Sequence, residues 1–242
     1  MDVELNNTQE EIEMMYWLFE LANAKKPSVK KYRKIRSEYE AMMERMVDYF
    51  YDHEEALRPR LDREIKQLQR NYRFGIRMDE SIRYEYETFL SLMIYPFFTS
   101  CICDMMLKKR KVRSEKNIEL VKNIRNSSFA LYKVLSRDYH TCTVMLEDVL
   151  TGQQVTIIDE RMSFDGKLGS MITARLFTIQ GFTFRTGVCY AFFEDDPDVL
   201  KWVKQQKKSK IETIGFIELY NLYQEKLKRK KAYVIKPQKA KK

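Results

Sequence analysis

The chain has 242 residues, of which 44% are hydrophobic, 13% aromatic and 33% charged. This composition excludes a globally disordered chain, because it supplies enough apolar surface to fill a core, and the length is compatible with two domains. The net charge of +9 is unevenly spread: residues 1–20 carry six acids and no base, whereas residues 201–242 carry fourteen bases and three acids. A partner with negative charge would therefore meet the helices and the tail.

Cysteine content and N-terminal charge indicate a cytoplasmic location. Four cysteines are too few for a disulfide framework in a chain of this size, and acids occupy the N-terminal segment where a signal peptide needs bases. The least charged window, residues 88–103, contains Pro96 and is too short to cross a bilayer. We therefore expect no membrane span.

The first helices are predicted from apolar spacing. Ile12, Met15, Tyr16 and Phe19 follow a capping box at residues 8–11, which predicts an amphipathic helix over about residues 9–25 with an acidic polar face. A second helix, capped by Ser28, is expected to end before Arg58. A third is expected to begin at Pro59 and to continue until Gly75.

Three more helical segments are predicted before residue 126. One begins at Asp79 or Ser81, runs to Met93 and is kinked or broken at Pro96; a second reaches about Lys111; the last spans residues 114–124. Together the helices predict an irregular helical bundle over residues 1–126.

After residue 126 the apolar period falls to two, which is typical of strands. Turns with glycine or aspartate separate short segments rich in β-branched and aromatic residues. We expect an α+β protein in which residues 127–193 form a small five-stranded antiparallel barrel of SH3-like or OB-like form. The expected strands are residues 129–135, 142–147, 153–159, 171–179 and 182–190.

The C-terminal part returns to helix. Asp196 and Pro197 supply a cap and a first-turn proline, and apolar spacing from Phe216 to Leu227 predicts a final helix. We expect residues 194–235 to form a basic helical extension and residues 236–242 a disordered basic tail.

Part of the barrel resembles a known module. Residues 146–155 read Leu-Glu-Asp-Val-Leu-Thr-Gly-Gln-Gln-Val, and residues 169–176 read Gly-Ser-Met-Ile-Thr-Ala-Arg-Leu. This pattern, over residues 129–187, is similar to a small β module of uncharacterised bacterial proteins that often precedes a SEC-C zinc motif. The resemblance implies a bacterial or phage origin and a small barrel, but no activity. No cysteine follows Cys189, so the SEC-C motif itself is absent.

Metal binding has one candidate set, formed by Cys101, Cys103, His140 and Cys142. On a helix, Cys101 and Cys103 point about 200° apart and cannot reach one ion, although His140 and Cys142 would share a face of a strand. The acids at residues 194–196 could hold a divalent ion, but a turn and a helix cap explain them as well. We expect structural roles for all of these residues, no metal and no cofactor.

Catalytic motifs are missing from the sequence. There is no Walker, Gly-x-Ser-x-Gly or Gly-x-Gly-x-x-Gly pattern, and one of only two histidines, His53, stands among acids near a helix end. We therefore expect no enzymatic activity and no small-molecule ligand, with an enzyme of unrecognised site as the last alternative.

Four basic runs, at residues 25–36, 58–77, 108–116 and 201–231, make nucleic acid a possible partner. Solvated helix faces explain much of this charge. The candidate phosphate contacts are Lys108, Lys109, Arg110, Lys111, Arg113, Lys228, Arg229, Lys230 and Lys231.

A protein partner is the leading hypothesis. The acidic first helix and acidic barrel, together with basic helices, favour pairing with another protein or between copies, and adaptors leave no catalytic motif. We expect a non-enzymatic protein-binding adaptor or regulator, with nucleic-acid binding as the alternative.

Overall fold

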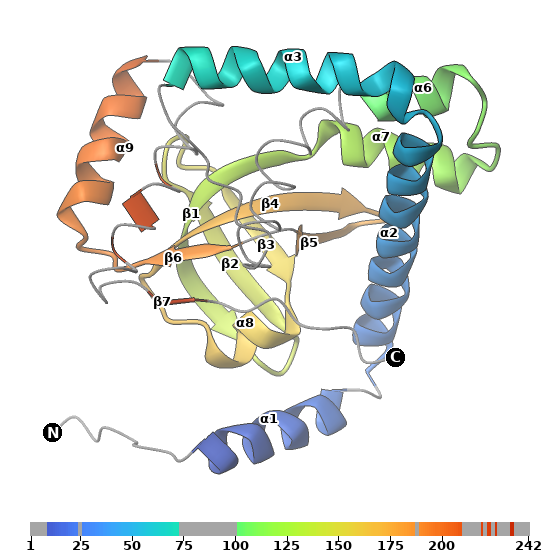
Figure 1. The fold of residues 1–242 in the computed structure, drawn as a ribbon. Helices are drawn as coiled ribbons and strands as arrows, with labels where there is room; N and C mark the ends of the chain where they lie inside the picture. The colour runs from blue at the N-terminus through green and yellow to red at the C-terminus, as the bar shows by residue number, and fades with distance from the viewer. Residues whose placement is uncertain are drawn as a thin grey trace, which may run out of the picture.

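A curved antiparallel sheet lies at the centre of the molecule, with helices around it (Figure 1). The computed structural model describes residues 9–23, 26–72, 101–186 and 189–209, together with residues 219, 222, 223, 226, 233 and 234. Among the helices within these ranges, none combines the length and the apolar character that crossing a bilayer requires.

Five strands form the barrel and confirm the predicted α+β fold class. They pair in the order β3-β2-β1-β4-β5, and β5 then lies beside β3, so that the barrel is nearly closed. Inward-facing residues alternate along the strands, as with Val144 and Leu146, because side chains on a strand have a period of two. The strands are β1 (Ser128–Asp138), β2 (Thr143–Asp148), β3 (Gln154–Ile158), β4 (Met171–Ile179) and β5 (Phe182–Thr186).

The barrel region differs from the prediction in three places. The expected strand 182–190 ends at Thr186, and a separate strand β6 (Tyr190–Phe192) pairs with Met171 and Ile172, the part of β4 that β5 leaves free. The second difference is a two-residue strand β7 (Tyr233–Val234), which pairs with β6 and lies within residues 194–235, where only helix was expected. The third difference is an unpredicted short helix, α8 (Glu160–Asp165), whose first turn is capped by Asp159.

The first three helices are α1 (Gln9–Asn23), α2 (Pro27–Asp52) and α3 (Glu54–Tyr72). Two predictions are wrong here. Pro27 and not Ser28 opens α2, with Lys26 at the cap position. The break after α2 falls at His53 and not at Pro59, which lies inside α3. At this break the His53 ring stacks on Tyr49 and its Nδ1 lies 3.0 Å from the Tyr49 carbonyl oxygen, the usual acceptor for the next helical bond.

Two of the remaining helices begin with a side-chain cap, of which the one at Asp196 was predicted. In α7 (Glu115–Asn126) the Ser114 hydroxyl accepts from the backbone N–H of Asn117, and in α9 (Pro197–Ser209) the Asp196 carboxylate accepts from two backbone N–H groups of the first turn. Helix α6 (Cys103–Lys108) ends three residues before the expected position. The predicted capping box at Thr8, the helix from Asp79 or Ser81 to Met93 with its break at Pro96, most of the final helix and the tail lie outside the described residues.

Two apolar cores hold the structure together, and both include strand residues. In the first, α2 lies against the outside of the barrel: Tyr39 meets Phe177 and Phe184, with ring centroids 4.9 and 5.9 Å apart. The second fills the barrel and continues to α9 and Tyr223. Since helices and strands share the first core, the structure does not separate them at residue 126. The domain boundary predicted there therefore stays a prediction.

Candidate interaction surfaces

A buried ion pair bridges β5 and the start of α8. Arg185 donates through Nε to Oδ2 of Asp159 at 2.9 Å, and the two side chains are only 9% and 4% exposed. The other carboxylate oxygen accepts from the backbone N–H of Met162. Burial alone would raise the pKa of Asp159, but the Arg185 charge and these hydrogen bonds lower it below its ordinary value. The same attraction overcomes burial and raises the pKa of Arg185.

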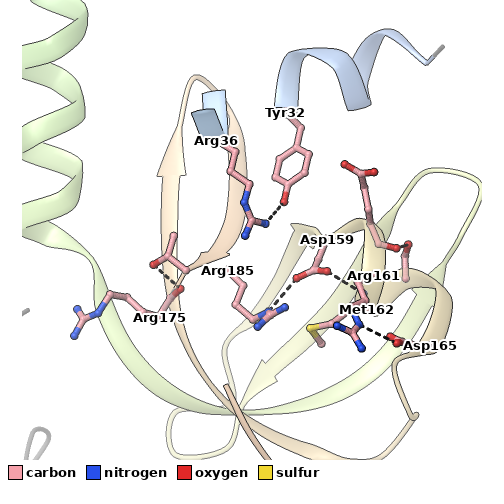
Figure 2. Close-up of polar contacts among 11 residues, drawn as sticks. Tyr32, Arg36, Asp159, Arg161, Met162, Asp165, Arg175 and Arg185 are labelled. Atoms are coloured by element: carbon pink, nitrogen blue, oxygen red, sulfur yellow. Dashed lines mark hydrogen bonds and ion pairs between the residues drawn. The ribbon is translucent and has the colours of Figure 1, made fainter. Parts of the chain in front are cut away.

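Helix α2 adds three polar side chains to this cluster. Figure 2 shows Tyr32 and Arg36 pointing into the region around Asp159, with the Arg36 guanidinium donating to the Tyr32 hydroxyl at 2.7 Å. Burial raises the pKa of Tyr32 to about 12. Arg33 pairs with Glu160 on α8, with its Nε 2.9 Å from Oε1. Each charge in the cluster has a partner, so the cluster ties α2 to the barrel.

The four residues considered as candidate metal ligands do not converge. Cys101 lies near Arg60 and Met105, and Cys103 is buried on α6. His140 and Cys142 lie in a turn and not on a strand, with His140 exposed and Cys142 buried. The part of the chain that the structure describes contains no group of three or more histidine, cysteine or acidic residues placed to hold a metal ion. All four cysteines are free thiols.

The acids at residues 194–196 have structural contacts. Glu194 pairs with Lys133, and Asp196 caps α9. Lys226 lies 2.8 Å from Asp196 and 3.0 Å from Asp198, and is itself almost fully buried. Although burial opposes it, these carboxylates raise the pKa of Lys226. The cluster attaches the C-terminal segment to the start of α9.

The residues that carry the module resemblance also have structural roles. The Asp148 carboxylate accepts from the backbone N–H groups of Leu150 and Thr151 in the β2–β3 turn. Gly169 has a φ of +78°, and a Cβ there would collide with the Glu194 carboxylate. Arg175 donates to the carbonyl of Ser127 at 2.9 Å, at the end of α7. These positions therefore shape the barrel and its junction with α7.

Helix α1 has two apolar faces. Tyr16 and Phe19 pack against Phe164 of α8, with ring centroids 5.9 and 5.1 Å away. The opposite side, about half a turn around the helix, carries a second apolar stripe in solvent. Met14 is 57% exposed, Trp17 57%, Leu18 51% and Leu21 54%. We refer to these four residues as the α1 stripe.

The α1 stripe was not predicted, although the sequence carries a signal for it. The face opposite Tyr16 and Phe19 was expected to be acidic, and the structure corrects this: acids flank the stripe, while its centre is apolar. The four stripe residues are spaced i, i+3, i+4 and i+7, which is the same period as the buried face. An apolar period on both sides of one helix predicts two packing surfaces.

The candidate phosphate contacts at the last residue of α6 and on the loop that follows it are all exposed. Lys108, Lys109, Arg110, Lys111 and Arg113 surround the buried Val112 and form no ion pair with other described residues. Arg110 has a φ of +50°, a left-handed conformation that favours glycine. The backbone N–H of Lys111 bonds to the carbonyl of Met106 at 3.0 Å, as in a glycine-terminated helix end. Lys228, Arg229, Lys230 and Lys231 lie outside the described residues.

Those parts of the four basic runs that the structure describes do not form one stripe. The start of α3 lies against the start of α6, where Arg60 approaches Cys101, whereas α2 and α9 lie on opposite sides of the barrel in Figure 1. In each run, at least one cation also forms an ion pair with a carboxylate of the same chain. The cations are Arg33 with Glu160, Arg58 with Glu54, Lys116 with Glu38, and Lys226 with Asp196.

Comparison with known proteins places the chain in a family without adding an activity. Neither a curated protein nor a solved structure matches the sequence. The model of a family of unknown function, DUF7986, matches residues 26–229, and α1 precedes this range. Since the match covers most of the chain, the protein belongs to the DUF7986 family.

Proposed function

We propose that the chain is a protein-binding adaptor or regulator that docks its partner on α1. The single observation that supports this most directly is the α1 stripe, because four large apolar side chains in solvent on one helix face are unfavourable unless a partner covers them. The proposal concerns this chain and not its whole family, because the family match begins after α1.

A different protein is a better occupant of the stripe than a second copy of α1. By the helical period, Glu13 and Glu20 lie along one edge of the stripe and Glu11 along the other, and α1 carries no base. Two such helices side by side would bring like charges together. A membrane surface is also disfavoured, because helices that lie on membranes carry lysine and arginine beside their apolar face.

A binding role also suits the chemistry of the thiols. Burial raises the pKa of Cys103 to about 12 and of Cys189 to about 11, and it raises the pKa of Cys142 as well. Such thiols remain protonated near neutral pH and are poor nucleophiles. The proposal includes a cytoplasmic location, supported by the four free cysteines, and a bacterial or phage origin, supported by the module resemblance.

Site-specific photo-crosslinking tests the proposal. Benzoylphenylalanine replaces Leu18 on the stripe or, as a matched control, Tyr51, which is similarly exposed at the end of α2 that lies away from α1. A protein crosslinked only from position 18 is then purified and titrated against the full chain. We expect a stoichiometric complex that the double variant Leu18→Ser/Leu21→Ser weakens at least about tenfold. Equal binding by the double variant, or no reconstituted complex, would refute the proposal.

A second candidate function is nucleic-acid binding by the loop after α6. The observation that favours it is Arg110, a cation in a backbone conformation where glycine is more stable, at the centre of five exposed bases. Replacing Lys108, Lys109, Arg110 and Lys111 by alanine should weaken binding and reduce its salt dependence by several phosphate contacts. Absence of a gel shift at low salt, with folded protein at micromolar concentration, would exclude this function.

A further inference from the structure

We infer that the partner presents a basic amphipathic helix to the α1 stripe. This inference rests on the proposed function and adds the chemistry of the partner. The stripe extends over two helical turns, or about 10 Å along the axis. Its i, i+3, i+4, i+7 spacing is the one by which an apolar helix face meets another helix. A helix lying along α1 therefore has four apolar contacts within reach.

The back of α1 is already occupied, which fixes the direction from which the partner arrives. Tyr16 and Phe19 hold the opposite face on Phe164, and the Asn23 side chain donates to the Phe19 carbonyl at 3.1 Å near the end of the helix. Figure 1 shows α1 at the edge of the molecule, with α8 as its nearest neighbour. The stripe therefore faces away from the body of the protein, and a partner can lie along it without displacing α1.

The edges of the stripe determine the charge of the partner. Glu13 and Glu20 on one edge and Glu11 on the other occupy the positions that, in paired helices, face the residues flanking the partner's apolar seam. Lysine or arginine at those flanking positions would form complementary pairs, whereas acids would be repelled. A helix with leucine-like residues in its seam and bases on both flanks therefore fits α1 better than an acidic one.

Three synthetic peptides of about 18 residues test this inference. The first has leucines at helical spacing flanked by lysines, the second has the same leucines flanked by glutamates, and the third has the composition of the first with the leucine spacing scrambled. Binding to the full chain is read from tryptophan emission. Trp17 is on the stripe, Trp202 is buried, and no other tryptophan is present, so the variant Trp17→Phe serves as the blank.

We expect the leucine–lysine peptide to shift the Trp17 emission to shorter wavelength in a saturable manner. Its affinity should exceed that of both other peptides at least about tenfold and should fall as salt rises. The variant Leu18→Ser/Leu21→Ser should abolish the shift, and Glu13→Gln/Glu20→Gln should weaken it. The matched control Glu55→Gln/Glu119→Gln, which neutralises two exposed glutamates elsewhere, should leave it unchanged.

Three results would overturn the inference. The first is equal binding of the lysine and glutamate peptides. The second is a concentration-dependent dimer of the peptide-free chain, seen by sedimentation and lost in the stripe variant, which would make a second copy the occupant. The third is a stronger Trp17 shift with neutral lipid vesicles than with any peptide. The crosslinked partner distinguishes failure of this inference from failure of the proposed function. If the lysine peptide does not bind but binding of the purified partner still requires Leu18 and Leu21, only this inference is refuted. If binding of that partner is also unchanged by Leu18→Ser/Leu21→Ser, the proposed function is refuted as well.

Discussion

The Arg185 guanidinium and the Asp159 carboxylate meet where β5 lies beside the end of β3, a junction with no backbone ladder between these described strands. A side-chain ion pair therefore takes the place of hydrogen bonds that would otherwise close the barrel. Because the same carboxylate caps α8, the pair also fixes the surface on which α1 packs.

The first prediction concerns this pair. Arg185→Met leaves the Asp159 charge buried without its cation, and should lower the free energy of unfolding by about 3–5 kcal/mol. Urea unfolding followed by circular dichroism measures the change. Arg58→Met, which removes the exposed pair with Glu54, is the control and should cost at most about 0.5 kcal/mol. Similar losses in the two variants would contradict the role of the buried pair.

The second prediction is the dependence of stability on acid. The pKa of Asp159 is lower in the folded protein than the value of about 3.9 in an unfolded chain. Its contribution is therefore fully present above the unfolded pKa and is lost as pH falls through the folded pKa. In urea titrations, Asp159→Asn should be less stable than the parent at neutral pH, and the difference should narrow in acid. A difference that is independent of pH would show that Asp159 acts without its charge.

The third prediction separates stability from charge in the loop after α6. Arg110→Gly relieves the left-handed conformation and should raise the free energy of unfolding by about 1 kcal/mol. Lys109→Gly, at a neighbouring residue with an ordinary φ of −81°, removes the same charge and should not stabilise. Thermal unfolding compares the two. Destabilisation by Arg110→Gly would mean that the arginine side chain itself supports the fold.

The fourth prediction distinguishes the two faces of α1. Phe19→Ala removes a side chain that packs on Phe164, so the backbone amides of α1 should exchange with solvent about tenfold faster. Leu18→Ala, on the exposed stripe, should leave exchange nearly unchanged because alanine is a strong helix former. Hydrogen exchange with mass spectrometry resolves the helix. Equal acceleration by both variants would contradict the assignment of the faces.

The fifth prediction concerns Lys226. Its pKa is raised in the folded protein, so its contribution to stability is present below the unfolded pKa of about 10.4 and is lost as pH rises through the folded value. Lys226→Met leaves Asp196 buried without this cation and should speed hydrogen exchange at the start of α9. Lys201→Met, at an exposed position of the same helix, is the control. Unchanged exchange in Lys226→Met would show that the C-terminal segment is held by apolar contacts alone.

Local patterns predicted most of the described fold. The five strands of the barrel, the position of α7 and the Asp196 cap of α9 follow from apolar period and capping chemistry, both of which act within a few neighbouring residues. The break at His53 was missed because it depends on ring stacking with Tyr49, whereas Pro59 gives the stronger local signal for a helix start.

The surfaces were harder to predict than the elements. The exposure of Trp17 depends on which of two apolar faces of α1 meets Phe164, and that choice is made by tertiary packing across more than a hundred residues. The left-handed conformation of Arg110 could not be predicted either, because an arginine gives no sequence signal for a positive φ.

The packing of Tyr39 on Phe177 and Phe184 has a consequence for synthesis on the ribosome. Helix α2 is made early, but the strands that cover its apolar face come near the end of the barrel. At a translation rate of about 5–20 residues per second, this face waits on the order of ten seconds for β4 and β5. During that interval the nascent chain exposes the tyrosine, isoleucine and methionine side chains of this face. Chaperones that recognise apolar segments can therefore bind α2 before the barrel is complete.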